Sequence, residues 1–543
     1  MSRPAEPGIA VAGTFTLDAV TEPMAFVLAR EAPGRSVAAA PYGQVLEAMH
    51  DPGSVLMANA GVNVLLVRPE DFVRGGGLAA LGERADAMVS ELVTVLGAVP
   101  DHSVATWFVA VLPSSPSVDQ DAALARWVRE AGEWIAAAVA ATPGMYPVPL
   151  DTLAELYGVA EMHDQYADRI AHLPYTDEYC TALATWLVRL AVSSWAKPKK
   201  VVVLDCDNTL WAGVCGEDGP TGVRVTEAHR GLQRFMSGQR SGGKLLCLCS
   251  RNNEADVEEV FARNTGMVLS WDDVTAHRIG WNPKAHSLRE LSDELDLALS
   301  SFIFVDDDAV ECASVRAQLP EVTTVELSRD GDEIRRQLDH TWAFDQLSTT
   351  DEDRLRADWY STRGERSALR DSSADYQDFL DRCEIEITFA ELAADGLERA
   401  AQLTARTTQF NLAGTGYSVS QLRAMLAGTA QGWLIKVRDR FGDYGTVGLV
   451  VGERHGDAVE LPVFLLSCRV LNRRVEQEVL RFVARHAESV GASTLRLPVR
   501  PTARNAPARL FIEQATGLVL SDADAPTTVS VPVREWAPQP AER

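Results

Sequence analysis

VVVLDCDNTL, residues 201–210, places two aspartates directly after a run of aliphatic residues. Such a run is typical of a strand that is buried in a parallel sheet. Asp205 and Asp207 stand at its end, separated by a single residue. Two carboxylates at that position repel each other unless a metal ion, a proton or the partner of a phosphoryl group lies between them. The stretch therefore predicts a buried strand that ends in a charged site.

Two further apolar segments end in polar residues in the same way. GKLLCLCS (243–250) ends at Ser250, and SFIFVDDD (301–308) ends in acids that include Asp306 and Asp307. Helix-like segments separate the three strands, so we expect a parallel sheet with right-handed crossovers. Chemistry in such sheets collects at the carboxyl ends of the strands, where these side chains would meet.

The side chains at these strand ends match the needs of phosphoryl transfer. That reaction requires a nucleophile, a proton donor, a cation and neutralisation of the phosphoryl oxygens. Asp205 is the candidate nucleophile, and Asp207 is the candidate general acid and base. Ser250 would hydrogen-bond a phosphoryl oxygen, and Lys284 would neutralise the growing charge.

A magnesium ion would let the carboxylates coexist, because Mg²⁺ prefers carboxylate oxygens, carbonyls and waters. The expected ligands are Asp205, Asp207, Asp306 and Asp307. Which of the last two binds the metal stays open, because the other would instead orient Lys284.

Length and composition exclude several classes of protein. The 543 residues exceed what one hydrophobic core serves, so several domains are expected. A formal net charge of −25 argues against binding to nucleic acid or to anionic membranes. No apolar run approaches the roughly 20 residues that span a bilayer, and the first residues make a poor signal peptide. The eight cysteines form no CxxC pair, so we expect reduced thiols and a cytoplasmic location.

The order DxDxT, Ser, Lys and DD, with each acid at a strand end, resembles the haloacid dehalogenase (HAD) superfamily of phosphatases. Further segments are similar to its FkbH-like branch, over roughly residues 160 to 520. They are LDCDNTLWAGVCGEDG (204–219), GWNPKAHSL (280–288), FIFVDDDAVEC (302–312), TTQFNLAGTGYS (407–418), DRFGDYGTVGLV (439–450), LSCRVLNRRVE (466–476) and PTARNAPARLF (501–511).

The resemblance implies an α/β, multi-domain fold with a central HAD-like Rossmannoid parallel sheet. We expect an N-terminal α/β domain of unclear role (1–195), a HAD-like phosphatase domain (196–345), a helical connector (346–380) and a GNAT-like α+β acyltransferase domain (381–543). No large insertion follows the strand at Val201, so the site should lack a big cap and stay open to a bulky partner.

The resemblance also implies a reaction. The family takes 1,3-bisphosphoglycerate, removes phosphate and delivers a glyceryl group to the phosphopantetheine thiol of an acyl carrier protein in polyketide pathways, with Mg²⁺ as cofactor. Further positions are expected to bind substrate: Asn208, Thr209, Arg251, Asn252 and Arg469.

The C-terminal domain departs from the GNAT pattern in one loop. The pattern R/Q-x-x-G-x-G/A, which holds a pyrophosphate on backbone N–H groups, here falls on residues 469–474. Asn472 and Arg474 fill the two glycine positions; Asn tolerates a left-handed backbone, but Arg crowds a close approach. This argues against binding of free CoA and is compatible with a carrier protein.

The thiol that carries the glyceryl group is not determined by the sequence. Cys468 lies beside Arg469, which would favour its thiolate, and is the candidate catalytic cysteine. Cys215 lies in the loop after the nucleophile, and direct attack by the carrier's own thiol needs no enzyme cysteine. Two other functions stay open: a carrier-docking scaffold with a degenerate HAD unit, and a plain small-molecule phosphatase.

Overall fold

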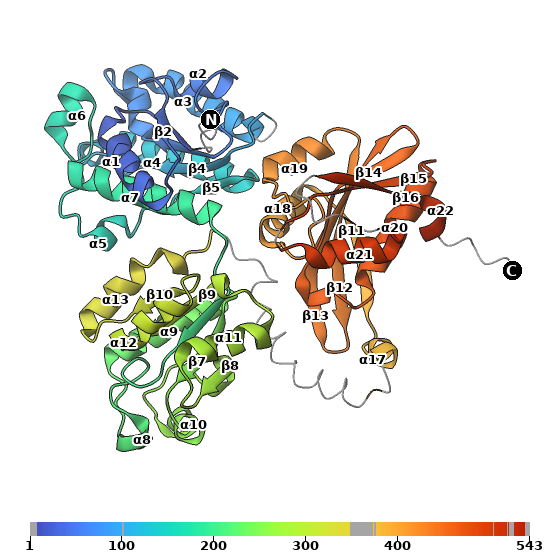
Figure 1. Ribbon diagram of the computed structural model, residues 1–543. Helices are drawn as coiled ribbons and strands as arrows, with labels where there is room; N and C mark the ends of the chain where they lie inside the picture. Colours follow the sequence, from blue (N-terminus) through green and yellow to red (C-terminus); the bar gives the residue numbers. More distant parts are fainter. Residues whose placement is uncertain are drawn as a thin grey trace. The chain divides into compact units, whose positions relative to one another are not determined.

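The computed structural model describes residues 8–99, 102–347, 373, 376–502, 504–518, 520 and 526–537. Their strands form three sheets (Figure 1). The chain divides into two compact units. One comprises the residues up to Trp195, Phe389–Ile435 and the residues from Val447 onward. The other comprises Ala196–Thr388 and Lys436–Thr446. The predicted domain boundaries stay predictions, and most of the predicted connector lies outside the described residues.

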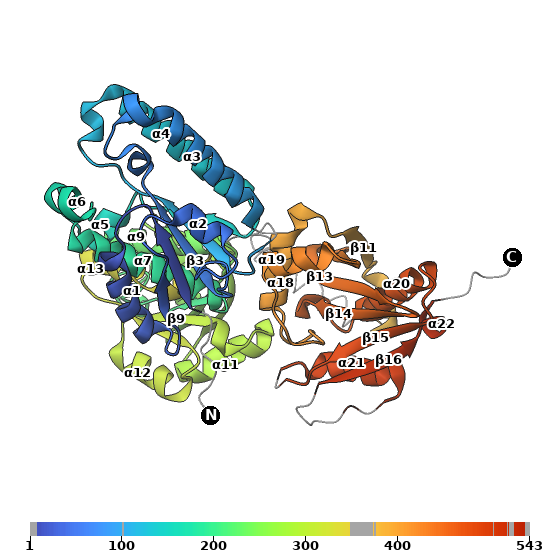
Figure 2. The ribbon, with the colours of Figure 1, turned by 90° about the horizontal axis from the view of Figure 1, so that it is seen from above.

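The N-terminal sheet is parallel, with the strand order β2-β1-β3-β4-β5. Its strands are β1 (Ile9–Gly13), β2 (Val37–Ala39), β3 (Val62–Val67), β4 (Thr106–Val111) and β5 (Met145–Pro147). Its helices are α1 (Asp18–Glu31), α2 (Val45–His50), α3 (Leu78–Ala98), α4 (Ala122–Ala141), α5 (Leu153–Tyr157), α6 (Gln165–Ala171) and α7 (Asp177–Trp195). Figure 2 shows α3 and α4 packed side by side. The predicted α/β character of this part is confirmed.

The central sheet is also parallel, with the order β10-β9-β6-β7-β8. Its strands are β6 (Val201–Leu204), β7 (Leu245–Ser250), β8 (Val274–Ile279), β9 (Phe302–Asp306) and β10 (Thr323–Glu326). Its helices are α8 (Cys215–Asp218), α9 (Glu227–Ser241), α10 (Glu254–Arg263), α11 (Lys284–Leu295), α12 (Ala309–Gln318) and α13 (Gly331–Asp339). The three strands predicted from apolar runs are β6, β7 and β9.

Both faces of β6 are buried, which explains its unbroken apolar sequence. Val202 and Leu204 pack in one core cluster, whereas Val201 and Val203 pack in another. Helices therefore cover both sides of the sheet, as expected for parallel strands. The whole segment between β6 and α9 is described and holds only the one-turn helix α8, so the prediction that no large cap follows the first strand is confirmed.

The C-terminal sheet is mixed and has the order β11-β12-β13-β14-β15-β16. Its strands are β11 (Glu386–Glu391), β12 (Ala430–Asp439), β13 (Gly442–His455), β14 (Ala458–Leu466), β15 (Thr494–Val499) and β16 (Thr527–Pro532). Its helices are α17 (Tyr376–Arg382), α18 (Leu397–Arg406), α19 (Val419–Leu426), α20 (Val475–Ser489), α21 (Ala506–Thr516) and α22 (Val533–Trp536).

The parallel pair in this sheet, β14 and β15, is joined by α20 and is paired only from Ala458 to Glu460 on the β14 side. Farther along β14, the backbone of Phe410 and Leu412 makes hydrogen bonds with Leu466 and Phe464. The segment that contains Phe410 and Leu412 therefore lies along the end of β14 that is not paired with β15. Within the described residues, no helix combines the length and the apolar character needed to cross a membrane.

Candidate active site

Lys284 holds two buried carboxylates together at the carboxyl ends of neighbouring strands. Asp205 follows β6, Asp306 ends β9, and Lys284 begins α11. The Lys284 ammonium donates a hydrogen bond to Asp205 Oδ1 and another to the carbonyl oxygen of Cys249 (2.7 Å), and it lies 3.0 Å from Asp306 Oδ2. All three charged side chains are buried. A buried carboxylate needs such a partner, so Lys284 explains how Asp205 and Asp306 are tolerated in the core.

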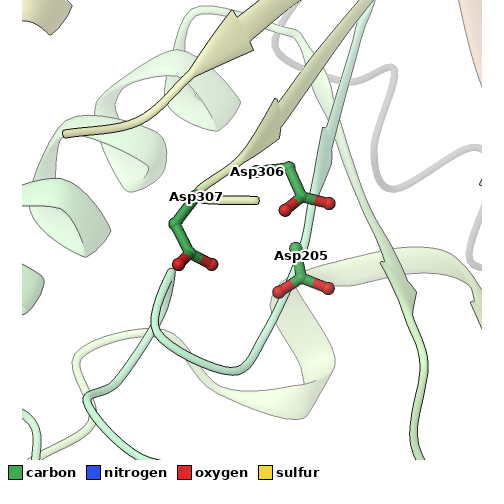
Figure 3. Close-up of side chains that lie close together, drawn as sticks. All are labelled: Asp205, Asp306 and Asp307. Atoms are coloured by element: carbon green, nitrogen blue, oxygen red, sulfur yellow. The ribbon is translucent and has the colours of Figure 1, made fainter. Parts of the chain in front are cut away.

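Three carboxylates converge at this point, as Figure 3 shows: Asp205, Asp306 and Asp307. One oxygen from each lies within 4.8 Å of the others. Asp307 is also paired at the rim with the exposed Arg329 (Oδ2–Nη2 2.9 Å). Although Asp306 Oδ2 lies near the Lys284 ammonium, it accepts no hydrogen bond in the described part of the structure.

These oxygens fit a divalent cation. Three carboxylates face one buried ammonium and one exposed guanidinium, so a negative charge is left over at the cluster. An all-oxygen donor set with excess negative charge is what Mg²⁺ prefers. Asp205, Asp306 and Asp307 are therefore the residues that would hold the ion.

Asp207 lies apart from this cluster on its own set of donors. Its Oδ1 accepts hydrogen bonds from Trp211 Nε1 (2.9 Å) and from the backbone N–H of Cys215 (3.0 Å). Its Oδ2 accepts from Asn252 Nδ2 (3.0 Å). The side chain of Asp207 was predicted both as general acid and base and as a metal ligand, and it is not among the three converging carboxylates found in the described residues. The structure thus separates the side chain suited to proton transfer from those suited to the ion.

Ser250 and Asn252 connect the end of β7 to Asp207. Both side chains are buried, and Asn252 Nδ2 lies 3.0 Å from Ser250 Oγ and also 3.0 Å from Asp207 Oδ2. The amide of Asn252 contacts both predicted catalytic side chains, and its predicted role in binding substrate stays a prediction. Ser250 stands where the sequence places it, at the carboxyl end of the strand.

The other predicted substrate-binding residues of this unit lie at the edge of the site. Thr209 Oγ1 is 3.5 Å from Asp307 Oδ1, so this buried hydroxyl faces the carboxylate cluster. Asn208 has a left-handed backbone (φ 56°), and its side chain accepts a hydrogen bond from the N–H of Gly213 (3.1 Å). Arg251 pairs with Glu311 at the start of α12 (2.9 Å). The Asn208 side chain thus stabilises a loop, and the half-exposed Arg251 lies at the rim.

Burial and like charge act on Asp205 in the same direction. Burial raises the pKa of Asp205, Asp306 and Asp207 add to the rise, and Lys284 opposes it. Burial alone would lower the pKa of Lys284, but the carboxylates of Asp205 and Asp306 raise it above its ordinary value. Lys284 is therefore charged at neutral pH, and a divalent cation at the cluster would favour the ionised form of Asp205.

Three cysteines at the two predicted sites differ in accessibility. Cys206, between Asp205 and Asp207, is fully buried in one core cluster with Val202 and Leu204, because alternate residues of an extended chain share a face. Cys215 is 2% exposed, and burial together with Asp207 raises its pKa to about 12. Cys468 begins a 3₁₀ turn, Cys468–Val470, and is half-buried.

Cys468 and Arg469 belong to the other compact unit, in the loop before α20. Asn472 and Arg474, the residues at the two glycine positions, both have left-handed backbones (φ 60° and 63°). Arg474 takes this conformation as the N-cap of α20, and the helix begins at Val475.

Glu476 was missed at the sequence level, although it lies in the first turn of α20. Its carboxylate is buried, and its Oε1 accepts a hydrogen bond from the backbone N–H of Asn472 (2.6 Å). The other oxygen, Oε2, accepts no hydrogen bond in the part of the chain that the structure describes. In the pattern R/Q-x-x-G-x-G/A, the loop N–H groups bind a pyrophosphate. Here the Glu476 carboxylate already accepts a hydrogen bond from one of them, the N–H of Asn472.

No protein-family model matches the sequence, and no curated protein matches it either. Among solved structures, the chain is similar to the N-terminal part of the protein BF1531 from Bacteroides fragilis, which contains a phosphatase domain complexed with Mg. The identity is 20%, the match covers 63% of this chain and 94% of that one, and the TM-score is 0.53. This likeness shows the fold, and the predicted α/β multi-domain architecture with a central parallel sheet is confirmed.

Acetyltransferases are similar to a smaller share of the chain. The ribosomal-protein-S18-alanine N-acetyltransferase from Escherichia coli is 14% identical over 29% of this chain and 99% of that one, with a TM-score of 0.21. The IAA acetyltransferase from Bacillus cereus is 11% identical over 24% of this chain and 75% of that one, with a TM-score of 0.18.

Proposed function

We propose that this chain is a Mg²⁺-dependent phosphatase coupled to acyl transfer, of the FkbH-like type. Its substrate would be 1,3-bisphosphoglycerate or a similar phosphorylated three-carbon acid, and its product a glyceryl thioester on the phosphopantetheine of an acyl carrier protein. The observation that carries the proposal is the buried cluster of Asp205, Asp306, Asp307 and Lys284, with Asp207 held beside it on separate donors.

The phosphatase step follows from these positions. The Asp205 carboxylate attacks phosphorus, and the bond to the substrate oxygen breaks while Asp207 donates a proton to that oxygen. Asp207 then takes a proton from water, which hydrolyses the aspartyl phosphate and frees Asp205. Lys284 and Ser250 stabilise the phosphoryl oxygens. Bound Mg²⁺, held by Asp205, Asp306 and Asp307, would supply further neutralisation of charge on the phosphoryl group.

The two phosphates of the proposed substrate need different treatment. The acyl phosphate at C1 is already activated, so a thiol can displace it without ATP. The ester phosphate at C3 is inert and requires the Asp205 site. The one-turn insertion after β6 supports access for a carrier-bound substrate, because no larger element stands between that strand and α9.

Two observations support a carrier protein over free CoA as the pantetheine donor. Glu476 already accepts a hydrogen bond from the N–H of Asn472, and its negative charge would repel a diphosphate at that loop. The loop and α20 also present arginines that suit an acidic carrier despite the net charge of −25. They are Arg469, Arg473, Arg474, Arg481 and Arg485.

Cys468 is the enzyme thiol that we propose as the acyl relay. It is half-buried, whereas Cys215 is buried and its pKa is raised to about 12, which disfavours the thiolate. The relay predicts an acyl-enzyme before any carrier protein is added. Cys468→Ala should then lose both that adduct and carrier loading, while the Asp205 site still cleaves a simple phosphomonoester. Normal loading by the variant would instead indicate direct attack by the carrier's thiol.

Intact-protein mass spectrometry of a holo carrier protein tests the proposed function. The carrier is incubated with enzyme, Mg²⁺ and 1,3-bisphosphoglycerate, and phosphate release is measured in parallel. We expect a glyceryl mass gain on the carrier and release of phosphate. Phosphate without a mass gain would indicate a plain phosphatase, and carrier binding without either would indicate a docking scaffold. Both outcomes would overturn the proposal.

A further inference from the structure

The N-terminal domain gathers polar side chains at the carboxyl ends of its own parallel strands. Thr14 follows β1, Tyr42 follows β2, and Asp71 lies in the 3₁₀ turn Pro69–Val73 that follows β3. His172 reaches the same place from the end of α6. This is the edge of an α/β sheet at which ligands generally bind. The phosphatase site in the other compact unit uses none of these residues.

Three of these residues form a continuous hydrogen-bonded chain from the core to the surface. Asp71 Oδ1 lies 2.9 Å from His172 Nε2, and His172 Nδ1 lies 2.8 Å from the hydroxyl of Tyr42. An ionised carboxylate only accepts hydrogen bonds, so His172 Nε2 donates to Asp71. In a neutral imidazole Nδ1 is then the acceptor, and the Tyr42 hydroxyl donates to it. This is the order of roles in a carboxylate–imidazole–hydroxyl triad.

The inner end of the chain is held rigidly. Thr14 Oγ1 donates to Asp71 Oδ2 (2.7 Å) and accepts from the backbone N–H of Arg68 (3.0 Å). The Arg68 guanidinium is almost fully buried, and its Nη1 lies 3.7 Å from Asp71 Oδ1. Side chains fixed in this way hold the imidazole in one orientation, as a preorganised site requires.

The outer end of the chain is open. Tyr42 is 60% exposed, whereas the side chains of His172 and Asp71 are 8% and 5% exposed. Tyr42 stands in a tight turn closed by a hydrogen bond from Gln44 N to Pro41 O (3.3 Å), and Gly43 takes the left-handed position (φ 72°) with open space beside it. His172 is itself left-handed (φ 53°), a conformation that is uncommon outside glycine and is concentrated at functional sites.

We propose that Asp71, His172 and Tyr42 form a second reactive site, in which the Tyr42 hydroxyl accepts an activated acyl group of the acyl phosphate class. The phenol oxygen attacks the carbonyl carbon, and its proton passes to His172 Nδ1. The bond from that carbon to the phosphate oxygen breaks, and phosphate leaves with the electron pair. The product is a phenyl ester on Tyr42, and the resulting imidazolium is stabilised by Asp71. This inference does not depend on the function proposed for the Asp205 site.

The full-length chain offers an internal control, Tyr166, which is 64% exposed and lies in α6 next to Arg169. Benzenesulfonyl fluoride modifies nucleophilic phenols, so its rate of reaction can be followed at each tyrosine by peptide mass spectrometry. We expect Tyr42 to react at least about tenfold faster than Tyr166, because only Tyr42 has a general base. Equal rates at the two positions in the unmodified protein would overturn the proposal without any variant.

Variants of His172 and Asp71 show whether Tyr42 reacts fast because of these two side chains or only because it is exposed. His172→Gln and Asp71→Asn should each slow Tyr42 to the rate of Tyr166, whose own rate stays unchanged. Circular dichroism and thermal unfolding of each variant report that the domain is folded. A Tyr42 rate that is unaffected in both variants would contradict the relay.

Acetyl phosphate then tests the proposed substrate class. Acetyl-Tyr42 should form in the wild-type chain and be absent in His172→Gln. Sulfonylation without acetylation would contradict the assignment as an acyl acceptor. Tyr42→Phe should leave phosphomonoester cleavage at the Asp205 site intact.

Discussion

The Asp205 site and the loop at Cys468 use charge in opposite ways. In the first, three carboxylates converge around one buried ammonium, and negative charge is left over for a cation. In the second, Arg469 directly follows Cys468, and the carboxylate of Glu476 already accepts a hydrogen bond from the backbone N–H of Asn472. The charges of the first site therefore favour a metal ion, whereas the charge of Glu476 disfavours a free diphosphate at the second. In the function that we propose, phosphorus chemistry and acyl chemistry are divided between the two regions.

The largest effect should come from Asp205→Asn. The amide keeps the shape but cannot attack phosphorus, so we expect phosphate release from a phosphomonoester to fall by about 10⁴-fold or more. Asp308→Asn is the matched control, because Asp308 caps α12 with its side chain and Asn also caps helices. Phosphate release near the wild-type rate by the Asp205→Asn variant would show that Asp205 is not the nucleophile.

Asp207→Asn should be the next most severe. Asparagine still accepts the hydrogen bonds from Trp211 and Cys215 but transfers no proton, so we expect a loss of about 10²- to 10⁴-fold on glycerol 3-phosphate. The loss in kcat/KM, which reports formation of the aspartyl phosphate, should be much smaller on p-nitrophenyl phosphate, whose leaving group departs without a proton. Equal losses in kcat/KM on the two substrates would argue against a general acid at this position.

Lys284→Met tests the charge balance of the cluster. Loss of the ammonium leaves Asp205 and Asp306 buried without a partner, which should cost about 3–5 kcal/mol of unfolding free energy in a chelator. Mg²⁺ should recover part of that loss, because it binds the folded carboxylates. Denaturant unfolding with and without Mg²⁺ measures this. Lys244→Met, which removes another buried lysine, should destabilise the chain to an equal extent in both conditions.

If Mg²⁺ stabilised neither the wild type nor Lys284→Met against denaturant, the three carboxylates would not hold the ion. The Asp205 site would then need another source of positive charge.

The smallest effect concerns Glu476 and depends on pH. Burial raises the pKa of Glu476 above its ordinary value, so the folded chain holds this proton more tightly than the unfolded chain does. Stability from this group is therefore complete at acid pH and falls as the pH rises through the raised pKa. Glu476→Gln keeps the acceptor for Asn472 and should be more stable than the wild type by about 1 kcal/mol near pH 8.

Below the ordinary pKa of glutamate, the Glu476→Gln variant and the wild type should unfold alike. Thermal unfolding at the two pH values is the measurement. A variant that is less stable at pH 8 would show that the loop N–H groups use the full negative charge, which would strengthen the contrast with the Asp205 site.

The Asp205 site was readable from the sequence because each of its acids follows an apolar run. Parallel strands bring their carboxyl ends to one edge, so residues 100 positions apart meet without any knowledge of the packing. β8 and β10 were missed because these edge strands carry polar residues, VTAHRI and TTVE, in place of an unbroken apolar run. The set of metal ligands could not be settled from the sequence, because the pattern DxD does not show whether the Asp207 carboxylate points toward Asp205 or away from it.

The remaining features depend on contacts that no local pattern encodes. The hydroxyl of Tyr42 meets an imidazole 130 positions away, and that imidazole meets a carboxylate 101 positions away. The sequence around Tyr42 carries no motif that marks these three residues as a set. Glu476 is similar: a glutamate in the first helical turn is common, and only the left-handed loop before it turns that side chain toward Asn472.

The mass of the carrier adduct made by Asp205→Asn tests most directly whether the two chemistries are divided. The variant is incubated with holo carrier protein, Mg²⁺ and 1,3-bisphosphoglycerate, and the intact carrier is weighed beside the product of the wild-type enzyme. Because acyl transfer does not use Asp205, we predict that the variant loads a glyceryl group that keeps its C3 phosphate. The wild type should load a glyceryl group without phosphate. A phosphate-free adduct from the variant, or no adduct at all, would contradict the account.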